Sequence, residues 1–173
     1  MHCNAINDVK FVINGKGSEW KRIHQLAAKK KLDNVLFVSF GDKKVVRSLL
    51  SVSDLAYVSF KPLEVLGTSS PNKLFDAMAA GVPCAVNVDG WLRELVEHKN
   101  MGFYANPSDP ESFIGKLQQL RSDAEQLITY KLNARKTAEV YFSRIMLTDR
   151  IVEIVEGKEG PATKKALAYN VTG

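Results

Sequence analysis

The sequence has few cysteines, few histidines and no long apolar run, and each shortage argues against a class of protein. Its two cysteines, Cys3 and Cys84, have neither a CxxC nor a metal-ligand spacing, so reduced thiols are the default expectation. Its 3 histidines have no partners at helical spacing, which argues against a histidine metal site or histidine catalysis. No apolar run approaches a membrane span, and the first residues form no signal sequence. We therefore expect a cytoplasmic protein, with docking at the inner face of the membrane left open.

Several motifs of catalysis and nucleotide binding are also absent. The sequence contains neither the Gly-x-Ser-x-Gly elbow of hydrolases nor a Walker loop. Gly15-x-Gly17 follows an apolar run, but Trp20 occupies the position where a dinucleotide fingerprint needs its third glycine, which argues against a complete NAD site. A plain tight turn and a ligand contact explain the two glycines equally well. Basic residues are not interleaved with aromatic residues, which disfavours nucleic acid as a partner.

Composition describes a globular chain with one core. Of the 173 residues, 45% are apolar and 25% are charged, which is typical of a folded domain. The net charge of +5 suits an anionic small ligand, a membrane surface or nucleic acid, and does not choose among them.

Apolar runs without polar alternation, each followed by a helical pattern, predict a parallel sheet covered by helices on both faces. The predicted strands are residues 9–13, 34–40, 55–60, 84–88 and 102–105. Helices are predicted to begin at Ser18, Asp42, Ser70, Gly90, Asp109, Asp123 and Ser143. Residues 1–157 form the predicted domain, and residues 158–173 a flexible or late-docking tail. In such sheets ligands bind beyond the carboxyl ends of the strands.

The segment from residue 67 to residue 83 is predicted to form a helix with both ends marked. Ser70 is expected to cap it, with Pro71 at the first helical position and Gly81 in the left-handed conformation after the last turn. Lys73 in the first turn is unfavourable unless an anion is bound there, and Asp76 lies one turn deeper. This pattern indicates a site for a phosphorylated, hydroxyl-rich ligand, or else an ordinary capped helix with solvated charges.

Residues 69–83 also carry a resemblance to a known family. Their sequence is Ser-Ser-Pro-Asn-Lys-Leu-Phe-Asp-Ala-Met-Ala-Ala-Gly-Val-Pro, which resembles the Pro-x-Lys-Leu-Phe-Glu-x-Met-Ala-x-Gly-x-Pro signature of family 4 retaining glycosyltransferases of bacterial polysaccharide biosynthesis. Supporting stretches are residues 11–17, 53–58, 94–97 and 102–113, and the resemblance runs from about residue 9 to 155. It implies an α/β fold, a Rossmann-like parallel sheet with helices on both faces, as in the C-terminal, donor-binding half of a GT-B fold.

The resemblance implies a donor site, residue by residue. Asp76 stands where the family has a glutamate that hydrogen-bonds the ribose. The other donor-binding positions are Gly15 and Gly17 in the loop facing the donor, Phe40 near the base, and Ser69, Ser70, Asn72 and Lys73 around the diphosphate. The implied substrate is a nucleotide sugar, taken as a UDP-sugar, with no cofactor and no metal. No catalytic residue can be assigned.

The chain departs from the family pattern in three ways. Thr68 stands where the family often has a sugar-contacting glutamate, and the nearest acid is Glu64. The family's first strand and helix of this domain, with an arginine and a lysine that clamp the diphosphate, are absent, as is the acceptor-binding domain. A sheet of order 3-2-1-4-5-6 would lack its central strand, so residues 1–8 or another chain fills the gap, or the sheet is rearranged.

We therefore expect the donor-binding part of a retaining glycosyltransferase that transfers a sugar to a saccharide or lipid-linked acceptor. The isolated chain is expected to be nearly inactive, which assays with and without an acceptor domain would test. A non-catalytic nucleotide-sugar-binding subunit that completes a site with a partner chain is the main alternative. A GT-B-like epimerase and a flavodoxin-like binding domain are weaker ones, and homo-oligomer formation is left open.

Overall fold

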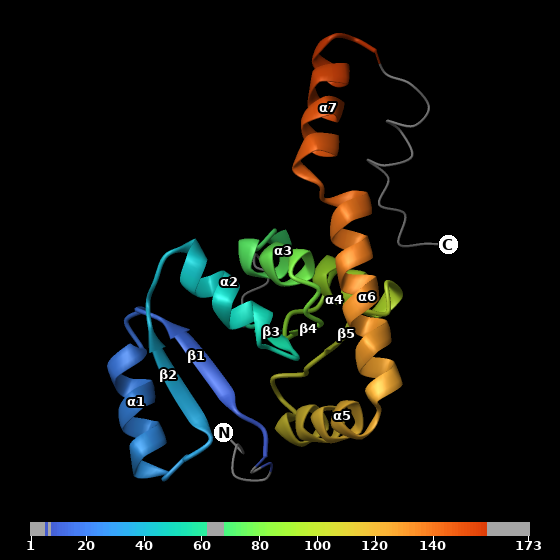
Figure 1. The fold of residues 1–173 in the computed structure, drawn as a ribbon. Coiled ribbons are helices and arrows are strands. Elements are labelled where there is room, and N and C mark those ends of the chain that lie inside the picture. The colour runs from blue at the N-terminus through green and yellow to red at the C-terminus, as the bar shows by residue number, and fades with distance from the viewer. Residues whose placement is uncertain (1–5, 7, 62–67, 159–173) are drawn as a thin grey trace.

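The structure is a computed structural model that describes residue 6, residues 8–61 and residues 68–158, and strands alternate with helices along most of it (Figure 1). The strands are β1 (Phe11–Gly15), β2 (Val35–Ser39), β3 (Ala56–Val58), β4 (Cys84–Val86) and β5 (Gly102–Tyr104). The helices are α1 (Trp20–Lys29), α2 (Lys43–Ser51), α3 (Asn72–Ala79), α4 (Trp91–His98), α5 (Pro110–Ser122), α6 (Ala124–Tyr141) and α7 (Arg144–Val155).

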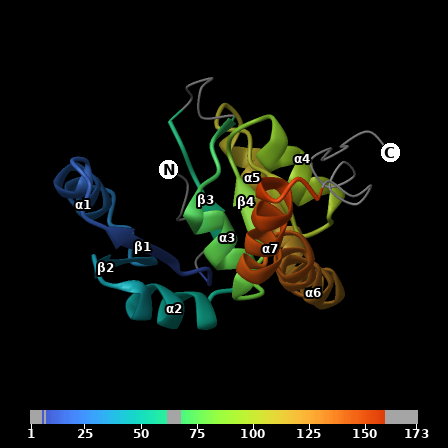
Figure 2. The same cartoon turned by 90° about the horizontal axis from the view of Figure 1, so that it is seen from above.

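All strand pairs are parallel, as the apolar runs predict, but the strands form two sheets instead of one continuous sheet. One sheet pairs β1 with β2, and the other has the order β3-β4-β5. Figure 2 shows β1 and β2 standing apart from β3 and β4. Among the described residues, no strand joins β1 to β3. The sheet is therefore divided, in agreement with the expected lack of a central strand. Most of residues 1–8, the segment named as one that could fill the gap, lie outside the described residues.

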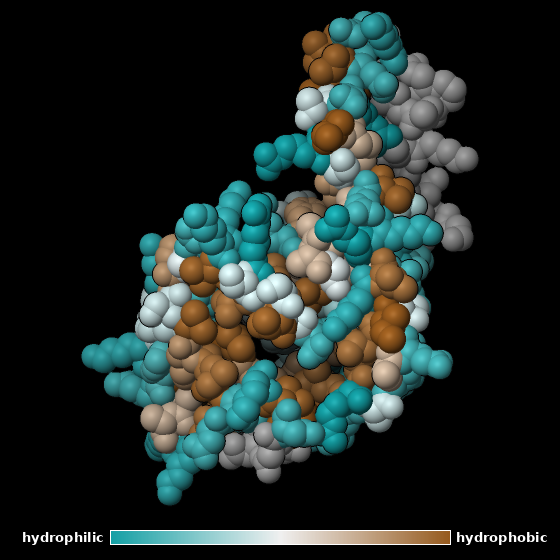
Figure 3. Space-filling model, viewed as in Figure 1, coloured by the Kyte–Doolittle hydropathy of each residue, from teal (hydrophilic) through white to brown (hydrophobic). Residues whose placement is uncertain are grey.

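Within the described chain, the division leaves one edge of β1 and one edge of β3 without a strand partner. The amide of Phe11 donates to the carbonyl of Asn34 (2.8 Å), and the amide of Ala56 donates to the carbonyl of Pro83 (2.8 Å). The backbone N–H and C=O groups of successive residues alternate in direction along a parallel strand. Those of Val12 and Tyr57 therefore point toward the open edges of β1 and β3. Both residues are about half exposed (45% and 49%). Figure 3 shows hydrophobic residues gathered around a hollow in the middle of one face.

Each sheet has its own hydrophobic core. In β4, Cys84 and Val86 belong to the largest cluster, formed with α3 and α4, whereas Ala85 points to the opposite face and packs with α5. Helices therefore cover both faces of this sheet, as the sequence predicts. A smaller cluster of Ala27, Leu32 and Val35 lies between α1 and the β1–β2 sheet.

Three predicted helix starts are confirmed by capping hydrogen bonds, and two are wrong. The carboxylates of Asp42, Asp109 and Asp123 accept from first-turn amides of α2, α5 and α6. However, α1 starts at Trp20 after Glu19, so Ser18 does not cap it.

Ser70 does not cap α3 either. The N-cap residue is Pro71, whose extended backbone (φ −79°, ψ 128°) delays the helix by one residue and leaves Ser70 outside the first turn. Gly81 has the predicted left-handed conformation (φ 70°).

The last helix, α7, extends away from both sheets (Figure 1). None of its residues is buried, and Ile145, Ile151 and Val155 are largely exposed. No described helix is long and apolar enough to cross a bilayer. The predicted tail lies outside the described residues, except for Lys158.

The thiol of Cys84 is expected to be inert. It is fully buried in β4, and burial raises its pKa to about 12. At pH 8 roughly one thiol in ten thousand is then ionised, against about a quarter for an ordinary cysteine, and only the thiolate reacts. In a Cys3→Ser variant, reaction with Ellman's reagent at pH 8 should be at least about 1,000-fold slower than in urea. Similar rates with and without urea would contradict the buried position.

Candidate functional site

The candidate residues lie at the carboxyl ends of the strands, in two groups that belong to different sheets. The first group joins the ends of β1 and β2. The side-chain amide of Asn14 donates to the carbonyl of Ser39 (2.8 Å), and the Lys16 ammonium lies 4.2 Å from the ring centre of Phe40. Phe40 is 58% exposed, so its outer surface is free to meet a flat ligand.

The two glycines of this first group have no packing role. A Cβ added to Gly15 or to Gly17 would meet no heavy atom within 4 Å. Neither glycine has a positive φ among the described backbone angles. Nothing within the described chain therefore requires glycine at these positions, which leaves the ligand-contact interpretation open.

The second group lies where β3 ends and α3 begins. Lys73 folds back onto the end of β3, where its ammonium donates to the carbonyl of Ser59 and lies 4.2 Å from the ring centre of Phe60. The side chain of Asn87, after β4, binds the backbone of the same Phe60. Partial burial lowers the pKa of Lys73, since the charged form is less well solvated there. A bound anion would favour that charged form.

The amino end of α3 is open to solvent. No described side chain caps it, and Ser70 and Asn72 are exposed, while Ser69 is half-buried. Asp76 is exposed one turn further along, and no other described residue binds its carboxylate. The uncapped amides can therefore bind an anion, with Lys73 beside them and a free carboxylate nearby.

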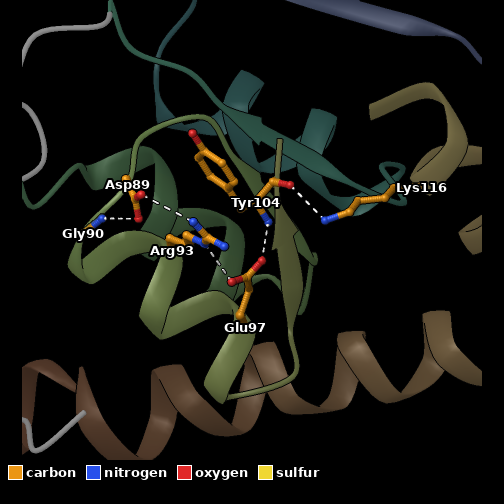
Figure 4. A network of polar contacts seen from close by, with 6 residues as sticks. All are labelled: Asp89, Gly90, Arg93, Glu97, Tyr104 and Lys116. Atoms are coloured by element: carbon orange, nitrogen blue, oxygen red, sulfur yellow. Dashed lines mark hydrogen bonds and ion pairs between the residues drawn. The ribbon is translucent and has the colours of Figure 1, made fainter. Parts of the chain in front are cut away.

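A third set of polar residues ties α4 and α5 to the end of β5 (Figure 4). Arg93 binds Glu97 (2.9 Å) and Asp89 (3.4 Å), and its guanidinium lies 4.6 Å from the ring centre of Tyr104. Glu97 in turn accepts from the Tyr104 amide (3.2 Å), and Lys116 donates to the Tyr104 carbonyl (3.1 Å). Both hydrogen bonding and the charge of Glu97 raise the pKa of Arg93. This cation is already neutralised, which makes Lys73 the better candidate for an anion contact.

The structure brings Gly15 close to Phe40, because Gly15 pairs with Ser39 and Lys16 contacts the Phe40 ring. In the second group, Lys73 contacts Phe60 and Ser69 is bound by Trp91. Sequence reasoning missed Phe60, Asn87 and Trp91 as members of the second group. Asn87 had a readable signal, because a polar residue directly after a buried strand lies at the ligand-binding edge. Within the described part of the chain, no group of three metal-ligating side chains occurs.

Comparison with known proteins decides the family. Residues 2–137 match the family described as Glycosyl transferases group 1. The chain belongs to this family. Its parallel sheets flanked by helices are those of GT-B glycosyltransferases, which agrees with the resemblance noted in residues 69–83.

Individual relatives are similar over only part of their own length. The chain is 32% identical over 119 residues to the N-acetyl-alpha-D-glucosaminyl L-malate synthase of Bacillus anthracis, covering 68% of this chain and 29% of the relative. It is 25% identical to the amylovoran biosynthesis glycosyltransferase AmsK of Erwinia amylovora, over 72% of this chain and 31% of the relative. Anabaena HepE, solved in complex with UDP, has the same fold, with a TM-score of 0.74 and 22% sequence identity. The match covers 90% of this chain and 44% of the HepE chain. The chain thus spans about a third of the curated relatives' length.

Proposed function

We propose that the chain is the donor-binding part of a retaining glycosyltransferase that moves a sugar from a UDP-sugar to a saccharide or lipid-linked acceptor. The observation that carries the proposal is the open amino end of α3, with Lys73 beside it and the free carboxylate of Asp76 one turn away. Helix amides and a lysine suit a diphosphate, and a carboxylate suits ribose hydroxyls. The UDP complex of HepE supports a uridine nucleotide as the donor.

In this proposal the helix amides and Lys73 stabilise the departing nucleoside diphosphate. Charge accumulates on the diphosphate as the bond to the sugar breaks, so fixed donors aimed at it lower the barrier. Asp76 orients the ribose and takes no part in bond breaking. Gly15, Gly17 and Phe40, on the other sheet, would contact the donor from the opposite side.

The alternative is a non-catalytic subunit that completes a site with a partner chain. The open edges of β1 and β3 favour it, because a strand from elsewhere would pair with both. Activity recovered only with a second protein would favour this alternative.

The test is nucleotide binding by the purified chain and by two variants. We expect UDP to raise the melting temperature of the chain more than GDP or ADP do. A ligand present at 100 times its Kd adds about 2.7 kcal/mol to the free energy of unfolding, so the nucleotide that binds best gives the largest rise. Lys73→Ala and Asp76→Ala should each weaken UDP binding roughly 10- to 100-fold, because each removes a charge-assisted hydrogen bond of about 1.5–3 kcal/mol. A thermal-shift assay measures the melting temperatures, and isothermal titration calorimetry measures the Kd for UDP.

Lys44→Ala is the matched control, since Lys44 is the second residue of α2 as Lys73 is of α3. It should leave UDP affinity within about twofold, as expected for an exposed lysine outside the site. Wild-type binding that neither Lys73→Ala nor Asp76→Ala weakens would show that the site is elsewhere.

A further inference from the structure

The segment that leads from β3 into α3 is held at its first residues by one side chain. The Asn87 carboxamide oxygen accepts from the Phe60 amide (2.8 Å), and its nitrogen donates to the Phe60 carbonyl (2.9 Å). The β3–β4 ladder ends at the pair of Val58 and Val86. Asn87, the next residue of the chain, therefore continues the pairing with its side chain after the backbone ladder has stopped.

The same segment is held near its other end by Trp91, the first residue of α4. Its indole N–H donates to the carbonyl of Ser69 (3.0 Å), two residues before the N-cap of α3. The indole ring packs against the largest core cluster, and its centre lies 6.5 Å from that of Phe75. Because the ring is fixed by packing, the donor at its edge is a rigid anchor.

Both anchors come from residues 87–91, which lead from the end of β4 into the first residue of α4, and both affect the surroundings of Lys73. Phe60 is the residue that Asn87 holds, and its ring lies beneath the Lys73 ammonium. Ser69 leads through Ser70 and Pro71 into the open amino end of α3. Movement of either anchored residue would displace the lysine or the amides that face the proposed ligand.

We propose that Asn87 and Trp91 are positioning residues, which hold Phe60 and Ser69 and so keep Lys73 and the α3 amides in place for a nucleoside diphosphate. The ligand in this inference rests on the proposed function. The anchoring itself does not, since it is a property of the chain without ligand.

Anchoring is tested first, by amide hydrogen exchange on the ligand-free chain. Asn87→Ala should speed exchange of the Phe60 amide about tenfold, because it removes the acceptor of that amide. Trp91→Phe should similarly speed exchange of the Leu74 amide, which donates to the Pro71 carbonyl (3.0 Å), because the turn that Ser69 leads into is no longer anchored. Trp91→Phe keeps an aromatic ring, so the core is retained. Near-UV circular dichroism verifies that each variant is folded.

Two controls lie away from the segment. Asn133→Ala removes an amide that donates to the carbonyl of Asn100 (2.9 Å), and Trp20→Phe changes the chain's other tryptophan, in α1. Neither should alter exchange of the Phe60 or Leu74 amides. Unchanged exchange at those residues in Asn87→Ala and Trp91→Phe would overturn the proposal.

Binding is tested second, by titration with UDP. Asn87→Ala and Trp91→Phe should each raise the Kd about tenfold, whereas both controls should leave it unchanged. If the wild type binds UDP and the variants bind equally well despite faster exchange, the positioning role is wrong. If the wild type does not bind UDP but exchange responds as expected, the anchoring stands and the proposed function fails.

Discussion

Gly102→Ala is expected to destabilise the fold by more than about 4 kcal/mol, which would leave little folded protein at 37 °C. Gly102 lies in β5 directly opposite Cys84 of β4. A Cβ at this position would lie 1.9 Å from the carbonyl oxygen of Cys84 and 2.7 Å from its carbonyl carbon. Because these are backbone atoms of a fully buried strand, no side-chain rotation relieves the clash, and the two strands must separate.

Gly115→Ala in α5 is the matched control. A Cβ there would meet no heavy atom within 4 Å. Since alanine favours a helix over glycine by about 1 kcal/mol, this variant should be neutral or slightly more stable. Urea denaturation of both variants measures the difference, and a Gly102→Ala variant as stable as the wild type would contradict the close approach of β4 and β5.

Leu92→Ala is expected to lower the free energy of unfolding by about 2–5 kcal/mol, but only in the part of the chain built on β3–β5. Leu92 is fully buried in the largest core cluster, and that cluster shares no buried residue with the one beneath α1. The two sheets are not joined by strand pairing among the described residues. The exposed ion pair of Asp8 with Arg121 adds little coupling.

Val35→Ala is the reciprocal variant, because Val35 belongs to the small cluster between α1 and the β1–β2 sheet. It removes two buried methyl groups, worth about 2 kcal/mol, and should loosen β1, β2 and α1 alone. Hydrogen exchange followed by mass spectrometry separates the two regions. If either variant accelerates exchange equally in both sheets, the cores are coupled and the division of the sheet has no energetic consequence.

Local signals in the sequence were sufficient for the order of elements and for several of their ends. Asp42, Asp109 and Asp123 cap their helices because a capping carboxylate needs only the amides two or three residues ahead of it. The strands follow from apolar runs, although β1 begins at Phe11, two residues later than predicted. Ser70 failed as a cap, because the extended backbone of Pro71 makes Pro71 the N-cap residue and leaves Ser70 outside the first turn.

The sequence by itself determined that this chain is an α/β protein with parallel strands, and residues 69–83 were enough to point to its family. Only the tertiary structure decided that the sheet is divided, that Lys73 lies on Phe60, and that Asn87 holds the same residue. The physical reason is distance along the chain: the hydrogen bonds of Asn87 to Phe60 span 27 residues. Contacts of that range depend on how whole elements pack, whereas a helix cap or an apolar run is complete within one short segment.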